Sequence, residues 1–395
     1  MGNITETQKS GREVWIDWAR IIACFMVIVV HCTEPFYLSG EDGAFISSKS
    51  NALWAAFFDS VVRACVPVFI VISCWLQFPL HYSAGEFFRR RAVRILIPFA
   101  LWTVVYAVVW GEPVENFRDL IFNFNYAAGH LWFVYMLLGI YLLMPLLSPW
   151  AAGVGKRELR FYLAIWLFTT LIPLIRDWMG GQPTLIFGPS GLPRQSLWPL
   201  WGEASWNGYG LFYYFSGFVG YLLLGLYLRK FVPVMSWLKT LAVAVPCYAA
   251  GFAVSFGGFL TRVWASSGGE FPTGDLTDAV WWETTWCNDT VGVALMTVAW
   301  ILVLRKIKCD GGFYNRVVLP LSKAGYGMYL CHLLILSPIF AWICEWLGGV
   351  GSAGAFGVWT APVEILLAAV CTFACTGAVS AVLQRIPKVG KYIRG

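Results

Sequence analysis

Long apolar runs recur along the chain from residue 15 to residue 383. A helix that crosses a bilayer needs about 20 mostly apolar residues. Ten segments meet this requirement, so the pattern predicts an all-α integral membrane protein, a bundle of about ten transmembrane helices. The predicted spans are 15–36, 52–78, 94–110, 130–150, 158–176, 208–228, 236–258, 287–304, 320–346 and 357–383.

Composition supports this assignment. Hydrophobic residues make up 58% of the 395 residues and charged residues only 13%, whereas a soluble domain has about 25% charged residues. The chain has too few charges to cover a water-facing surface, and no polar stretch of domain size interrupts the apolar runs. We therefore expect one transmembrane domain, 15–383, between an N-terminal tail, 1–14, and a basic C-terminal tail, 384–395.

The distribution of Arg and Lys predicts the orientation, because cytoplasmic loops are enriched in these residues. If the N-terminus is cytoplasmic, every inner loop is more basic than the outer loops beside it. We expect both termini in the cytoplasm of a multi-pass protein in the inner (plasma) membrane. The net charge of +6 then reflects topology and not nucleic-acid binding.

Eleven cysteines raise the question of disulfides or a metal site. Most lie inside apolar segments and no pair has C-x-x-C spacing, so they are expected to be small buried side chains, and no metal is expected. A bridge between Cys32 and Cys287 near the outer face stays open.

The first predicted helix carries polar residues that are costly inside a bilayer. Arg20 and His31 are eleven residues apart, which is three turns plus about 20°, so they share one helix face about 16 Å apart along the axis. Asp17 lies one turn before Arg20 and Glu34 one turn after His31. Either these residues form a site, or Arg20 reaches the headgroups and His31 bonds a neighbouring helix.

Three further features favour a polar interior site. Asp59 and Arg63 are spaced i, i+4 in the second predicted span, which is typical of an internal ion pair. Arg91 and Arg94 belong to a basic run that opens the third span, either as a topological signal or as a site for a phosphate-bearing cofactor. The other two histidines at membrane positions are His130 and His332.

Five stretches of the chain form a pattern when they are taken in order. They are Asp17-x2-Arg20-x10-His31, Val66-Pro67-Val68-Phe69-Ile70-Val71-Ile72-Ser73, Arg91-x-x-Arg94 with Pro98, His130-Leu131-Trp132-Phe133 with Tyr135 and Pro145, and Ser322 through Tyr329-Leu330-x-His332. Together they resemble the acyltransferase 3 family of membrane-bound O-acyltransferases, in particular members that O-acetylate surface polysaccharides. One departure is Cys74, which stands where the family usually has glycine.

The resemblance implies an acyl-CoA donor at the inner face, most often acetyl-CoA, and a carbohydrate acceptor of the cell envelope at the outer face. We expect CoA phosphates on Arg91 and Arg94, the pantetheine arm along Arg20 and Ser73, and the thioester at His31. His31 would act as general base or carry the acyl group transiently, with Glu34 orienting its ring. The residues expected to contact the acceptor are His130, Trp132, Tyr329 and His332, and those expected to act structurally are Asp17, Asp59 and Arg63.

A transporter or flippase for a glycan or lipid-linked glycan is the competing interpretation, since buried charges in ten spans suit it equally well. Transporters often contain internal repeats and broken helices, and no convincing repeat is evident here. A membrane sensor or scaffold is a third class, but it would not need a polar interior.

Overall fold

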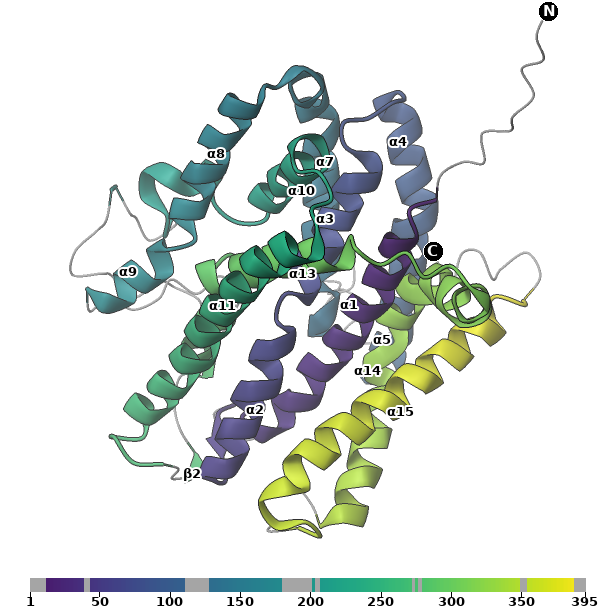
Figure 1. Ribbon diagram of the computed structural model, residues 1–395. Coiled ribbons are helices and arrows are strands. Elements are labelled where there is room, and N and C mark those ends of the chain that lie inside the picture. Colours follow the sequence, from purple (N-terminus) through teal and green to yellow (C-terminus); the bar gives the residue numbers. More distant parts are fainter. Residues whose placement is uncertain are drawn as a thin grey trace, which may run out of the picture.

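The computed structural model describes residues 12–38, 43–110, 128–179, 201–202, 207–271, 274–275, 279–348 and 354–386. These residues form a bundle of long helices (Figure 1). The α-helices are α1 (Val14–Thr33), α2 (Lys49–Val62), α3 (Cys65–Gln77), α4 (Ala84–Arg91), α5 (Ile97–Val109), α7 (Trp132–Gly153), α8 (Lys156–Thr169), α9 (Ile172–Trp178), α10 (Val219–Phe231), α11 (Trp237–Ser266), α12 (Ala279–Trp282), α13 (Val291–Leu304), α14 (Leu319–Leu347) and α15 (Thr360–Leu383).

Shorter elements extend or connect these helices. Two five-residue π-helical segments, η2 (Ala92–Leu96) and η6 (Tyr314–Val318), lead into α5 and α14. Two-residue strands, β1 (Phe45–Ile46) and β2 (Gly274–Asp275), pair in antiparallel register. The 3-10 turns are η1 (Glu34–Phe36), η3 (Gly129–Leu131), η4 (Gly210–Phe215), η5 (Glu283–Trp286) and η7 (Gly357–Trp359).

The predicted helical membrane protein is confirmed. Within the described residues, eight helices are long and apolar enough to cross a bilayer, and the pair Ala279–Trp286 and Val291–Leu304, bent by 40°, adds a ninth if it counts as one span. Large apolar side chains point outward from several of them, as Leu146 does with 76% of its surface exposed. Such side chains suit contact with lipid.

One predicted span differs from its structure. The sequence predicts a continuous helix at 208–228, but η4 occupies the first part and α10 is only 13 residues long. Gly217, with φ of 72°, separates the two elements in a backbone conformation that favours glycine. An apolar run of the right length therefore does not by itself make one spanning helix.

Helix α1 lies in the middle of the bundle, between α2 on one side and α14 and α15 on the other (Figure 1). It packs against α2, α3, α13, α14 and α15. Most of its residues are buried, including the polar Asp17 and Thr33. The helix with the most unusual polar residues is thus the one that touches most of the bundle.

Asp17 fixes the beginning of α1. Its two carboxylate oxygens accept hydrogen bonds from Arg12 (2.6 and 2.7 Å), from the Tyr314 hydroxyl (2.7 Å) and from the Ser322 hydroxyl (2.6 Å). Arg20 lies 3.6 Å from the same carboxylate. These bonds join α1 to η6 and α14, and they hold Arg20 beside a fully hydrogen-bonded anion.

Helices α11 and α13 approach each other closely at glycine. A Cβ atom at Gly251 would lie 2.4 Å from the carbonyl oxygen of Gly292, and one at Gly292 would lie 2.8 Å from the Ser255 hydroxyl oxygen. Small residues let helix backbones come together in this way inside membranes.

We expect Gly251→Ala to lower the thermal stability of the purified protein in detergent. Overpacking of this kind costs ~1–3 kcal/mol, more than the roughly 1 kcal/mol that alanine gains over glycine in a helix. Gly257→Ala in the same helix is the matched control, because nothing lies within 4 Å of a Cβ there. Equal melting temperatures for the two variants would contradict the close approach.

Candidate active site

A cavity of about 330 Å³ lies between α1, α3, η2, α7 and α14. Arg20 and His31, which share one face of α1, both line it, so the cavity follows that face of the helix. The other polar side chains in its lining are Ser73, Gln77, Arg91, Arg94, His130, Trp132, Tyr141, Ser322, Lys323, Tyr326 and Tyr329.

One end of the cavity is strongly basic. Arg91 ends α4 and Arg94 lies in the π-helical segment η2, and both line the cavity together with Arg20. The Arg91 guanidinium lies 5.6 Å from the ring centres of Phe87 and Tyr141. Guanidinium groups stacked on rings keep their hydrogen-bond donors available for an anion.

Three imidazole rings gather at the other end. The ring of His332 lies 5.0 Å from that of His31 and 4.9 Å from that of His130, and the rings of His31 and His130 are 6.3 Å apart. His31 and His130 line the cavity, while His332 is fully buried behind them. The rings come from α1, η3 and α14, so residues far apart in the sequence meet at one point.

In two of these rings, the hydrogen-bond partner shows that Nδ1 carries a hydrogen. Nδ1 of His332 lies 2.5 Å from the carbonyl oxygen of Tyr329, and a carbonyl oxygen only accepts, so this nitrogen carries the hydrogen. Nδ1 of His31 lies 2.8 Å from a carboxylate oxygen of Glu34, and an ionised carboxylate likewise only accepts. In the neutral ring, Nε2 of His31 then has a free electron pair.

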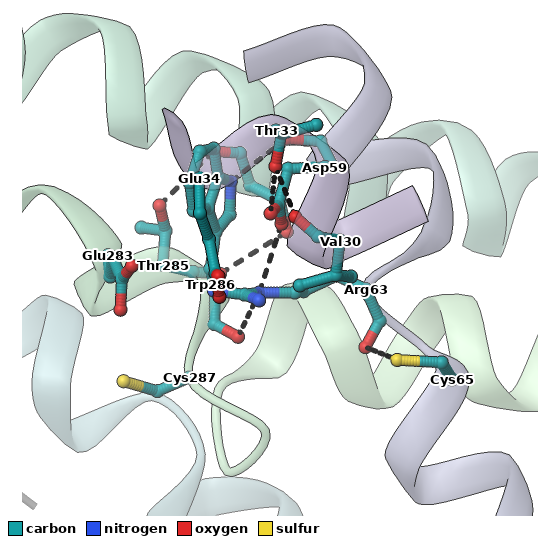
Figure 2. Close-up of polar contacts among 12 residues, drawn as sticks. Val30, Thr33, Glu34, Asp59, Arg63, Cys65, Glu283, Thr285, Trp286 and Cys287 are labelled. Atoms are coloured by element: carbon teal, nitrogen blue, oxygen red, sulfur yellow. Dashed lines mark hydrogen bonds and ion pairs between the residues drawn. The ribbon is translucent and has the colours of Figure 1, made fainter. Parts of the chain in front are cut away.

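A buried ion-pair network, centred on Asp59 and Arg63, lies near Glu34 (Figure 2). The Arg63 Nε is 3.1 Å from an oxygen of Asp59 and donates to the carbonyl oxygen of Trp286, also at 3.1 Å. Thr33 donates to the other Asp59 oxygen at 3.0 Å. Thr33 comes directly before Glu34, so its bond to Asp59 ties the turn that carries this carboxylate to α2.

A third carboxylate completes this network. Glu283, in η5, interacts electrostatically with Arg63 and accepts a 2.6 Å hydrogen bond from the Tyr37 hydroxyl. Trp286 lies under the Arg63 guanidinium, 5.1 Å from the ring centre, and its indole donates to Ser60. The Glu34 end of α1 is thus held by α2 and η5, as the Asp17 end is held by η6 and α14.

The structure brings most of the expected site residues to one cavity. Arg20, His31, Ser73, Arg91, Arg94, His130, Trp132 and Tyr329 line it. Glu34 and His332 contact His31 from outside the lining, and Asp59 and Arg63 lie one layer further out.

Sequence reasoning missed several residues of the site, of which Lys323 and Glu283 carry charge. Lys323 adds a fourth cation to the cavity lining and stands next to Ser322, inside a stretch that had been singled out. Glu283 belongs to the buried network through its hydrogen bond with Tyr37 and its electrostatic interaction with Arg63. The one feature of the sequence that could have pointed to it is a carboxylate within the aromatic stretch Trp281–Trp286.

No disulfide joins cysteines in the described part of the chain. Its cysteines are all free thiols, including Cys32 and Cys287, so the bridge between these two that the sequence left open does not form. Among the same residues, no group of three His, Cys, Asp or Glu side chains is arranged to hold a metal ion.

The helical bundle and the enclosed cavity with a basic end and an imidazole end define a multi-pass membrane protein with an interior site. The sequence profile of the acyltransferase 3 family, described as an acyltransferase domain, matches residues 13–381. The chain therefore belongs to this family and is a membrane acyltransferase. Neither the curated proteins nor the solved structures gave a match to the chain.

We expect Arg63→Leu to destabilise the protein strongly, because it leaves the Asp59 carboxylate buried without its cation. Breaking one partner of a buried pair costs ~3–5 kcal/mol. The double variant Asp59→Asn/Arg63→Gln removes both charges and should melt above the single variant in detergent. A single variant as stable as the wild type would show that the pair contributes nothing.

Proposed function

We propose that this acyltransferase moves an acetyl group from cytoplasmic acetyl-CoA to a hydroxyl group of a cell-envelope carbohydrate or its lipid-linked precursor. One observation supports this most: a single cavity follows the face of α1 from Arg20 to His31 and joins guanidinium groups to an imidazole. The chemistry of the two ends fits the two ends of acyl-CoA, which has phosphates at one end and a thioester at the other.

The basic end suits the phosphates. Arg91 and Arg94 supply two guanidinium groups to the basic end of the cavity, and Arg20 and Lys323 line the same space. Guanidinium groups bind phosphate oxygens through paired hydrogen bonds. The arm of an extended CoA is long enough to cover much of the roughly 16 Å between Arg20 and His31, passing Ser73 on the way.

The imidazole end suits acyl transfer. His31, whose Nδ1–H points to Glu34 at 2.8 Å, has Nε2 as the base. Nε2 takes the proton of the acceptor hydroxyl as that oxygen bonds to the thioester carbon, and it then returns the proton to the leaving sulfur when the C–S bond breaks. The products are the ester and the CoA thiol. A histidine suits this role because it both accepts and releases a proton near neutral pH.

The acceptor is proposed to enter at the His31 end. Trp132 and Tyr329 line the cavity beside His130, and an aromatic wall of this kind suits the apolar face of a sugar. His332 lies behind this wall, so its contact is with the rings of His31 and His130. In this arrangement the donor and acceptor approach His31 from opposite sides of the membrane.

We expect His31→Ala to lower the rate of acetyl transfer at least ~10²–10⁴-fold, because it removes the general base. The measurement is release of CoA from acetyl-CoA by the purified full chain with a carbohydrate acceptor. His81→Ala is the matched control, since this exposed histidine lies outside the cavity. Full activity of His31→Ala would remove His31 from the mechanism.

We expect Arg91→Gln and Arg94→Gln to raise the KM for acetyl-CoA more than the KM for the acceptor, because they remove phosphate contacts. Arg89→Gln is the control, an exposed neighbour outside the cavity lining. In calorimetry, Arg91→Gln and Arg94→Gln should bind CoA more weakly than the wild type, and Arg89→Gln should bind it equally well. A wild-type protein that binds no CoA would instead favour the transport of a glycan.

A further inference from the structure

Attack on a thioester places negative charge on the former carbonyl oxygen. Enzymes stabilise this charge with hydrogen-bond donors that are already in position before the reaction. Much of the cavity wall around His31 is apolar: Val27 lies one turn away on α1, and Phe69 packs against Phe133 with ring centres 6.0 Å apart. Few side chains in that region have an N–H or O–H to offer.

His130 is such a side chain. It lines the cavity next to His31, only 6% of its surface is exposed, and neither ring nitrogen has a hydrogen-bond partner among the described residues. An imidazole has one N–H when neutral and two when protonated, so a donor is present in either form. A buried donor without a partner costs about 1–3 kcal/mol, which a bound substrate atom would offset.

The neighbouring hydroxyl group is already engaged. Tyr329 also lines the cavity, but its hydroxyl donates to the backbone carbonyl oxygen of His130 at 2.6 Å. This bond positions η3, the turn that carries His130, and it leaves the Tyr329 hydroxyl without a hydrogen to donate to a substrate. The His130 ring is further enclosed by Tyr106, with ring centres 4.9 Å apart, and by His332 at the same distance.

We propose that His130 is a catalytic residue whose ring N–H donates a hydrogen bond to the carbonyl oxygen of the acyl group during transfer. This inference rests on the proposed function, since it requires an acyl thioester at His31. As the acceptor oxygen bonds to the acyl carbon, the carbonyl electron pair moves onto oxygen, where His130 stabilises it. The pair returns when the C–S bond breaks, and His130 keeps its proton throughout.

The geometry gives the two histidines different tasks. The Nδ1–H of His31 is held by Glu34, which frees Nε2 to move a proton. No carboxylate is hydrogen-bonded to His130, and the rings of Tyr106, Tyr329 and His332 pack around its imidazole. A base and an oxyanion donor must both reach the same reacting group, and the rings of His31 and His130 line one cavity with their centres 6.3 Å apart.

The test compares His130→Phe, which keeps a ring without a donor, with His130→Gln, which keeps an N–H donor. In the purified full chain we expect His130→Phe to lower kcat for acetyl transfer ~10²–10³-fold, the usual effect of losing one oxyanion donor, with little change in either KM. His130→Gln should recover part of that loss. Binding of CoA, measured by calorimetry, should be unchanged in both and shows that they are folded.

Three results would overturn the proposal. The first is an unchanged kcat in His130→Phe, and the second is a kcat for His130→Gln no higher than that for His130→Phe. The third is an increase confined to the acceptor KM, which would make His130 a binding contact. In each case the wild type still transfers acetyl, so the proposed function stands. A wild type that neither binds CoA nor transfers acetyl would overturn the proposed function, and this inference with it.

Discussion

Inside a bilayer, polar side chains must find their partners within the protein, because no bulk water is present to take their place. Helix α1 meets this requirement at its two ends: Asp17 is enclosed by Arg12, Tyr314 and Ser322, and Glu34 lies beside His31 and the Arg63 network. The bonds of Asp17 attach the first end of α1 to η6 and α14, and the bond from Thr33 to Asp59 attaches the other end to α2. The residues on the cavity face of α1 lie between these two attachments.

The groups that hold α1 in place differ in hydrogen bonding from two of the histidines beside the cavity. The carboxylate of Asp17 has several donors and Arg63 is surrounded by acceptors, so neither has capacity left for a substrate. The ring nitrogens of His130 and Nε2 of His332 are buried without partners in the described residues. Buried polar atoms of that kind are rare in folded proteins, and these three nitrogens stand beside the cavity that Arg20 and His31 line.

Much of this arrangement could be predicted from the sequence. The apolar runs predicted the membrane bundle, and helical periodicity placed Arg20 and His31 on the face that lines the cavity. The contact of His31 with His130 and His332 could not be predicted from spacing, because it depends on how three helical elements far apart in sequence pack together. Glu283 was missed for the same reason, and 208–228 was misjudged because hydropathy does not distinguish a 3-10 turn from a helix.

The contact between Cys74 and Gly225 makes two positions in different helices behave as one steric unit. The Cys74 thiol lies 2.9 Å from the carbonyl oxygen of Leu222, and a Cβ at Gly225 would lie only 3.0 Å from the Cβ of Cys74. There is room for one side chain at this crossing of α3 and α10, and cysteine fills it from the α3 side. A side chain added at Gly225 would have to displace Cys74, so the residue at either position restricts what the other can be.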